Sequence, residues 1–217
     1  MAGIGMSPSR ALVFASMLFA GVVTSSTPAA AEDARGAELF GLCSQCHGEQ
    51  GEGNQLALAP AIAGLPQWYV EAQLGYFRNG GRGDHPQDIA GLHMRPMSRA
   101  LRTDEDLKLV AAYVASLPPV RPEPVVEAGD AQRGAGLYTV CAQCHGAAGE
   151  GNQALNAPPL RNMSDWYLVS GLERYKAGIR GGNPKNPNGI MMRGMAMSLA
   201  DEQAIRDVVA YITTFGN

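Results

Sequence analysis

The feature of this chain that most restricts its fold is an internal repeat, which aligns without a gap when the sequence is shifted by 98 positions. The shift places the segment CSQCHG, residues 43 to 48, on CAQCHG, residues 141 to 146. It also places GEGNQ at 51 to 55 on an identical GEGNQ at 149 to 153. Further matches are Gly36 with Gly134, Phe40 with Tyr138, Pro60 with Pro158, Trp68 with Trp166, and Tyr113 with Tyr211. Self-similarity of this length indicates a duplicated structural unit.

The two copies are joined by a proline-rich segment. Four prolines between residues 118 and 128 disfavour helix and strand and favour an extended path, so this segment is the predicted linker. The predicted domains are then residues 32–117 and 129–217. Each has about 90 residues, which is too few for a generous core, so a buried apolar group should complete each domain.

The first 31 residues are typical of an export signal. Arg10 precedes a predominantly apolar stretch of thirteen residues at 11 to 23, and Ala29-x-Ala31 offers a small-residue cleavage site. The alternative is a membrane anchor, but the run is short for a span of about 20 residues. We therefore predict cleavage near Ala31 and a soluble periplasmic protein.

The chain is predicted to be all-α, since no segment shows a convincing strand alternation. Asp33 and Asp130 are candidate N-caps for helices that run into the two cysteine pairs. Apolar residues recur at helical spacing in four further segments, which are residues 66–79, 104–116, 164–177 and 201–215.

The cysteines admit several chemistries. Disulfides are common in exported chains, but each pair here spans four residues and is followed directly by a histidine. A thioredoxin-like dithiol needs no such histidine, and a zinc site would need the two pairs close together. The pattern Cys-x-x-Cys-His is a c-type haem attachment site, in which the thiols form thioethers and the histidine binds iron. We predict two covalent haem c groups, held by Cys43, Cys46 and His47 and by Cys141, Cys144 and His145.

The sixth iron ligand is less directly specified. His85 and His93 could bind iron, but the second copy has Asn183 and Met191 in their places. Two methionine pairs do align, and they lie 47 and 50 residues after the motif histidines. The candidates are therefore Met94 with Met192, or Met97 with Met195, and spacing alone does not choose between them.

These residues together resemble class I cytochromes c, and in particular the two-haem cytochrome c4 group, over nearly all of the mature chain. The resemblance implies two small helical domains, each folded around a haem, with terminal helices that cross at small and aromatic residues. It also implies that Pro60 and Pro158 accept a hydrogen bond from the motif histidines through their carbonyl groups.

In that family the ligand methionine lies seven residues before a leucine that precedes the last helix. Leu101 and Leu199 take this place, which selects Met94 and Met192 as the iron ligands. The first copy departs from the family after this leucine, because Arg102 stands where a serine is usual. Thr103 is then the expected helix cap.

Arg82 and Arg180 share one position of a glycine-rich loop. Either they are solvated charges, or they bind the haem propionates, since a guanidinium binds carboxylates in a fork. Tyr69 and Tyr167 could donate to propionates in the same way.

The predicted chemistry is electron transfer rather than catalysis. A His/Met pair fills both axial positions and raises the reduction potential through its thioether sulfur. The net charge of −3 argues against a nucleic-acid partner. Residues 32–120 carry 11 acidic and 7 basic side chains, whereas residues 128–217 carry 7 and 8, an asymmetry that can orient the molecule toward a charged partner.

Three functions fit this picture. The first is a periplasmic carrier that takes electrons from a quinol-oxidising complex and passes them to a terminal oxidase or reductase, which would bring it to the membrane surface. The second is a bound cytochrome subunit of a dehydrogenase, such as flavocytochrome c sulfide dehydrogenase. The third is a catalytic two-haem enzyme, either a peroxidase or a thiosulfate-oxidising protein. A peroxidase would normally need a longer chain and one haem with an open coordination position. A thiosulfate-oxidising protein would use a cysteine as distal ligand, but all four cysteines here belong to the haem attachment motifs.

Overall fold

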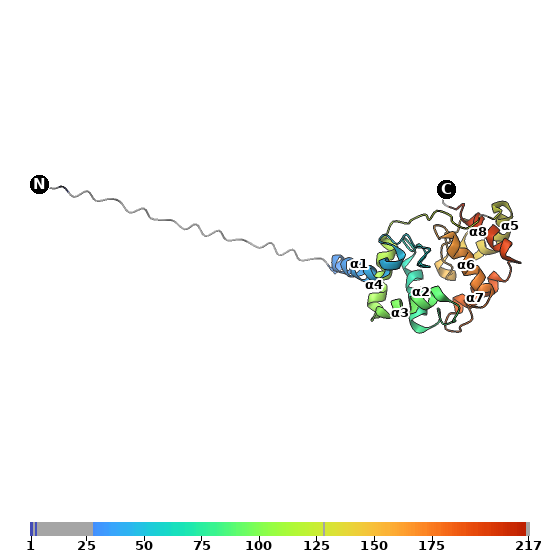
Figure 1. The fold of residues 1–217 in the computed structure, drawn as a ribbon, viewed down its shortest axis with the longest axis horizontal. Coiled ribbons are helices and arrows are strands. Elements are labelled where there is room, and N and C mark those ends of the chain that lie inside the picture. Colours follow the sequence, from blue (N-terminus) through green and yellow to red (C-terminus); the bar gives the residue numbers. More distant parts are fainter. Residues whose placement is uncertain (2, 4–27, 128, 216–217) are drawn as a thin grey trace.

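The computed structural model describes residues 1, 3, 28–127 and 129–215. These residues form eight α-helices and one short 3₁₀ helix, with no strand beyond two isolated bridges (Figure 1). The first half contains α1 (Pro28–His47), α2 (Gln67–Asn79), α3 (Ile89–Ala100) and α4 (Asp104–Ser116). The second half contains α5 (Ala131–His145), η1 (Gln153–Leu155), α6 (Asp165–Lys176), α7 (Pro187–Ala196) and α8 (Glu202–Ile212). The all-α prediction is therefore confirmed.

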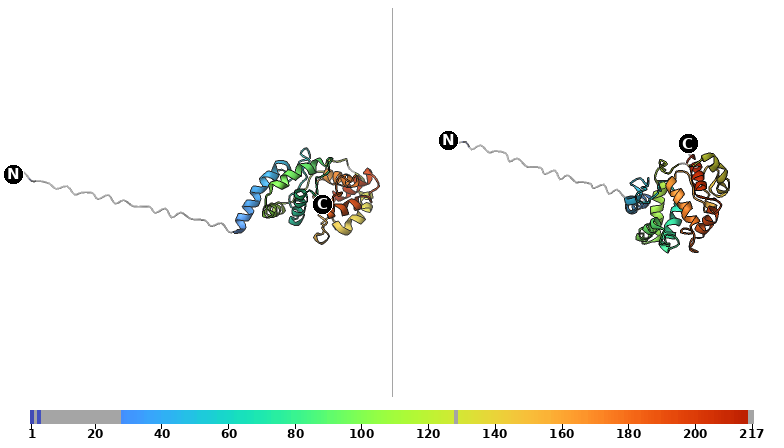
Figure 2. Two further views of the ribbon diagram at one scale, coloured as in Figure 1. Left: turned by 90° about the horizontal axis from the view of Figure 1, so that it is seen from below. Right: turned by 45° about the vertical axis from the view of Figure 1, so that its right-hand side comes forward.

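The two halves lie side by side, with α1 to α4 on one side and α5 to α8 on the other (Figures 1 and 2). Residues 118–127 between them contain no helix or strand. Most of the predicted export signal lies outside the described residues, so its cleavage stays a prediction. Among the residues that are described, no helix is both long and apolar enough to span a membrane.

The predicted helix caps are partly confirmed. Asp130 caps α5, where its side chain accepts hydrogen bonds from the backbone N–H groups of Gln132 and Arg133. Thr103 caps α4, as expected. The prediction for Asp33 is wrong, because this residue lies inside α1. The residue that aligns with Asp130 is Glu32, and glutamate is not among the side chains that favour the N-cap position.

Two helices were not foreseen, and both carry the candidate iron ligands. Met94 lies in α3, which contains a proline, and Met192 lies in α7, which begins at one. Asp88 and Asn186 cap these helices by accepting from the backbone N–H three residues later, at 3.2 and 2.8 Å. Neither helix was predicted, because Pro96 lies inside α3 and because glycines weaken the helical signal of α7.

The terminal helices of each half cross where a glycine permits close approach. A Cβ atom on Gly36 would lie 2.7 Å from the carbonyl oxygen of Leu109, so α1 and α4 could not meet there with any larger residue. Gly134 gives α5 and α8 the same freedom. Aromatic rings pack beside both crossings, with centroids 5.2 Å apart for Phe40 and Tyr113 and 5.5 Å apart for Tyr138 and Tyr211.

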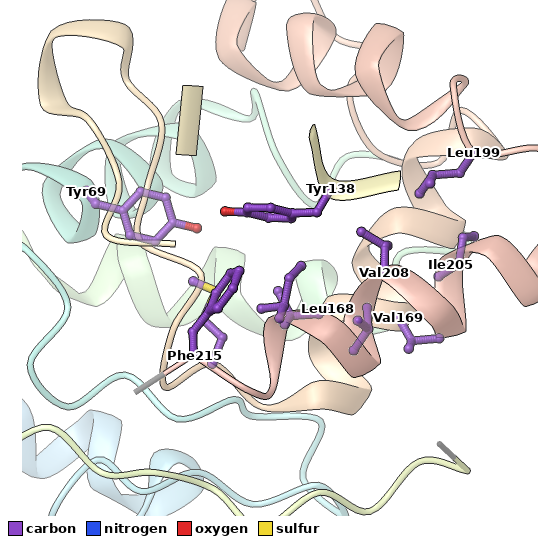
Figure 3. Packing of buried hydrophobic residues seen from close by; sticks show 11 residues of the cluster. Tyr69, Tyr138, Leu168, Val169, Leu199, Ile205, Val208 and Phe215 are labelled. Carbon is purple, nitrogen blue, oxygen red and sulfur yellow. The ribbon is translucent and has the colours of Figure 1, made fainter. Parts of the chain in front are cut away.

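The core of the second half extends into the first. Tyr69 from α2 is buried in the same cluster as Tyr138, Leu168 and Ile205 of the second half (Figure 3). The linker also packs on the second half, because the backbone N–H groups of Val125 and Val126 both donate to Asp165. The halves are therefore packed against each other, rather than held only by a tether.

Candidate haem-binding sites

The second Cys-x-x-Cys-His motif occupies the last turn of α5. Because Cys141 and His145 are four residues apart on this helix, their side chains lie on the same face. Both line one cavity of the second half, together with Tyr167 and Arg180. Gly146 ends the helix with φ of +84°, a conformation suited to glycine. None of the four cysteines forms a disulfide bond, so all four are available for thioether bonds to haem.

The motif histidines are buried and oriented by one hydrogen bond each. Nδ1 of His145 lies 2.8 Å from the carbonyl oxygen of Pro158, and Nδ1 of His47 lies 2.8 Å from that of Pro60. Burial lowers the pKa of both imidazoles, although the hydrogen bond opposes this shift. Each ring is therefore neutral, with its proton on Nδ1 and with Nε2 free to bind a metal. The contact expected from the resemblance is present in both halves.

In the second half, the structure brings Met192 and His145 into the same cavity. Met192 also lines an adjoining hollow of about 640 Å³, together with Cys144 and His145. Met195 lines this hollow but not the larger cavity. Because Met192 shares the larger cavity with His145 and Met195 does not, Met192 is the better candidate for the second iron ligand.

In the first half, the motif cysteine and the candidate methionine lie beside the same part of the hydrophobic core. Cys43 and Met94 both pack against one buried cluster that includes Phe40 and Leu101. Met97 is 38 % exposed on the same helix. His93 is exposed as well, and His85 accepts a hydrogen bond within its own loop from the backbone N–H of Gln87. Met94 is thus the candidate best placed to serve as a ligand.

Two arginines, one from each half, converge on a single phenol. The Arg82 guanidinium donates to the Tyr167 hydroxyl at 2.9 Å, and the Arg180 guanidinium donates at 3.4 Å. Among the described residues, neither guanidinium forms an ion pair with a carboxylate, and the buried Nε of each has no hydrogen-bond partner. Although burial raises the pKa of Tyr167, the charges of Arg180 and Arg82 outweigh it and lower this pKa to about 7. Such a positive region is suited to anionic groups.

The residues present therefore fit a haem c in each half. The thiols, the neutral imidazole and the thioether are the donor set of covalent His/Met haem ligation. The unpaired guanidinium groups match the negative charge of propionates. The convergence of Arg82 and Arg180 could not be found from the repeat, since aligning two copies shows equivalent residues and not contacts between copies.

Comparisons with known proteins agree with this description. The family model described as Cytochrome c matches twice, at residues 34–118 and 131–215. The Thiosulfate dehydrogenase electron acceptor of Thiomonas intermedia (strain K12) is 32% identical over 173 residues, which cover 74% of this chain and 73% of the relative. Cytochrome c4 of Azotobacter vinelandii is 30% identical over 200 residues, covering 88% and 92%. The crystal structure of reduced recombinant cytochrome c4 from Pseudomonas stutzeri superposes with a TM-score of 0.64 at 25% identity, covering 84% of this chain and 98% of that one.

Proposed function

Because the chain belongs to the cytochrome c family and is a two-haem electron-transfer protein like cytochrome c4, we propose that it is an exported carrier between a respiratory donor and a terminal oxidase or reductase. When bound, each haem supplies one-electron exchange between ferric and ferrous iron. The carrier would act in the periplasm and hold one electron per haem.

The arrangement of axial ligands carries this proposal. We assign His47 and Met94 to the first iron and His145 and Met192 to the second. With a histidine and a methionine supplied to each iron, the protein would leave no coordination position for a substrate, so the bound haem would exchange electrons and not bind a reactant. The prolyl carbonyls hold the imidazole rings in place and would fix the orientation of these iron ligands.

We further assign Arg82 and Arg180 to the haem propionates. Their guanidinium groups are held by stacking, with Arg82 4.4 Å above the Phe77 ring and Arg180 4.5 Å above the Tyr175 ring. Positive charge that is fixed beside a haem favours the reduced state, because ferric iron carries one more positive charge than ferrous iron. These arginines would therefore help to keep both potentials high.

A second candidate function is suggested by how two of the relatives are described, since their descriptions name a specific electron donor. Two relatives, at 32% and 33% identity, are described as thiosulfate dehydrogenase electron acceptors. The corresponding role for this chain is to accept electrons from a thiosulfate dehydrogenase, either as a free carrier or as a bound subunit.

An optical redox titration of the purified holoprotein tests the core of the proposal. We expect two one-electron steps at high potential, with low-spin spectra and a methionine-to-iron band at the red end. Stopped-flow mixing with a thiosulfate dehydrogenase or with a quinol-oxidising complex then identifies the donor by the faster reduction. A high-spin ferric haem, or one haem per chain, would contradict the assignment.

A further inference from the structure

One ion pair joins the two halves at the helix that carries Met94. The Asp88 side chain is 5 % exposed, and its Oδ1 lies 3.7 Å from Nη1 of Arg174, whose side chain is 22 % exposed. Asp88 is also the N-cap of α3 and accepts a hydrogen bond from the backbone N–H of Gly91 at 3.2 Å. A single carboxylate therefore both begins the Met94 helix and contacts the opposite half.

The repeat does not reproduce this pair. The residues that align with Asp88 and Arg174 are Asn186 and Tyr76. Asn186 caps α7 in the same manner, accepting from Gly189 N–H at 2.8 Å, but it carries no charge. The Tyr76 hydroxyl accepts a hydrogen bond from Asn188 at 3.2 Å. The residue pair that begins at the N-cap is therefore charged beside the first haem site, and the equivalent residues beside the second haem site are neutral.

Other charged residues close to Asp88 do not remove this difference in charge between the two halves. Arg95 follows Met94 directly, but Arg193 follows Met192 in the same way, so this charge is common to both halves. Asp84 is exposed and accepts a hydrogen bond from Asn183. Asp165 and Asp207 are also buried, but neither lies on a helix that carries a candidate methionine ligand. Among these three aspartates, Asp88 is the one that caps such a helix.

We propose that Asp88 and Arg174 make the two haems unequal, with Asp88 lowering the reduction potential of the first haem and Arg174 raising that of the second. Asp88 precedes Met94 by six residues, about 9 Å along the helix axis. Arg174 lies on α6, which lines the second cavity through Gly171, Leu172 and Tyr175. This inference rests on the proposed two-haem function, but it does not depend on the identity of either partner.

Asp88 and Arg174 are positioning residues, which act through the Met94 helix and through their charge. A unit charge at about 10 to 15 Å, in a medium of effective dielectric constant about 20, changes a one-electron equilibrium constant roughly three- to tenfold after solvent screening. Tenfold corresponds to 59 mV for a one-electron couple.

The test is a redox titration of the full holoprotein in a set of matched variants. Asp88→Asn removes the charge and keeps the cap, because asparagine is the residue at the equivalent position of α7. Arg174→Gln removes the opposite charge. Glu105→Gln changes the net charge as Asp88→Asn does, at an exposed position of α4. Met94→His and Met192→His assign each step to its haem, and thermal unfolding with far-UV dichroism confirms that each variant is folded.

We expect Asp88→Asn to raise the potential of the first haem and Arg174→Gln to lower the potential of the second. Each shift should correspond to a change of about three- to tenfold in the one-electron equilibrium constant. The double variant should show both shifts, and Glu105→Gln should leave both steps nearly unchanged. Asn186→Asp, the mirror change, should lower the second potential.

The sign of the shifts separates charge from mere structural support. Loosening of α3 would instead lower the first potential in Asp88→Asn, since it would weaken methionine ligation. A fall or no shift of the first potential in Asp88→Asn, or a rise or no shift of the second potential in Arg174→Gln, would overturn the inference. If Met94→His moved neither step, the ligand assignment would fail instead.

Discussion

The Nδ1 atom of His145 and the carbonyl oxygen of Pro158 lie 2.8 Å apart, and Gly151 is what allows the loop to bring them together. A Cβ atom on Gly151 would lie 2.8 Å from the carbonyl carbon of Pro158 and 2.5 Å from the nitrogen of Pro159. Its φ of +81° is also strained for any residue with a side chain. The orientation of the histidine thus depends on a glycine in another segment of the chain.

Gly151→Ala should therefore weaken this hydrogen bond. We expect a loss of about 1 to 3 kcal/mol in the free energy of unfolding. We also expect a higher potential for the second haem, because a less basic imidazole stabilises ferric iron less. Denaturation and redox titration measure the two effects. Gly136→Ala is the control, since it lies in α5 with open space around it; an equal effect there would contradict the argument.

Replacing the candidate iron ligands separates the two methionine pairs. Met192→His should preserve a low-spin haem but lower its potential by roughly 0.1 to 0.3 V, a part of the span of about 0.8 V that axial ligands cover. Met195→Leu should change neither the potential nor the red-end absorption band, because Met195 lines only the adjoining hollow. Spectra and titrations of both variants decide the assignment, and the opposite pattern would select Met195.

The sequence predicted the parts of this protein that depend on local pattern. Helix α4 follows from its apolar spacing, and the orientation of His47 toward Pro60 follows from the family resemblance. Helices α3 and α7 were not predicted. Pro96 interrupts the pattern of α3, and α7 is short and contains two glycines, which are poor helix formers. Capping by Asp88 and Asn186 helps to stabilise the two helices.

Ion pairs whose residues do not align between the two copies could not be predicted from the repeat either. Arg35 and Arg133 are equivalent, and each pairs with an aspartate on the last helix of its half. The partners are Asp106 and Asp207, which do not align, since Leu109 is the equivalent of Asp207. The aspartates differ by about one helical turn, yet both lie on the face that meets the arginine. Such pairs are set by helix packing and not by sequence register.

Leu58 has an unfavourable backbone conformation that the second copy avoids. Its φ is +55°, and the equivalent residue, Asn156, has a φ of +53°. Asparagine tolerates this region, whereas leucine incurs a cost of roughly 1 to 2 kcal/mol. Leu58→Asn should raise the free energy of unfolding by about 1 kcal/mol, as measured by chemical denaturation. Leu56→Asn is the control, since Leu56 is 98% exposed and should change stability little. A destabilised Leu58→Asn variant would show that the leucine side chain makes a packing contribution larger than the strain.

The acid stability of the second half should depend on Asp207. This carboxylate accepts hydrogen bonds from the Arg133 guanidinium at 2.8 Å, from the Asp130 N–H at 2.8 Å and from Gln203 at 2.9 Å. These bonds, that of Arg133 above all, hold the pKa of Asp207 well below its usual range.

Because the folded-state pKa is depressed, the unfolded chain binds the proton more readily, so the contribution of Asp207 is complete above about pH 4. It is lost as the pH falls below that value toward the folded-state pKa. Asp207→Asn should therefore lower the melting temperature at pH 7 and flatten its decline below pH 4. Thermal unfolding followed by dichroism between pH 2 and 7 measures both effects. Glu123→Gln, an exposed acid in the linker, should keep the wild-type profile; an undiminished decline in Asp207→Asn would place the acid sensitivity elsewhere in the chain.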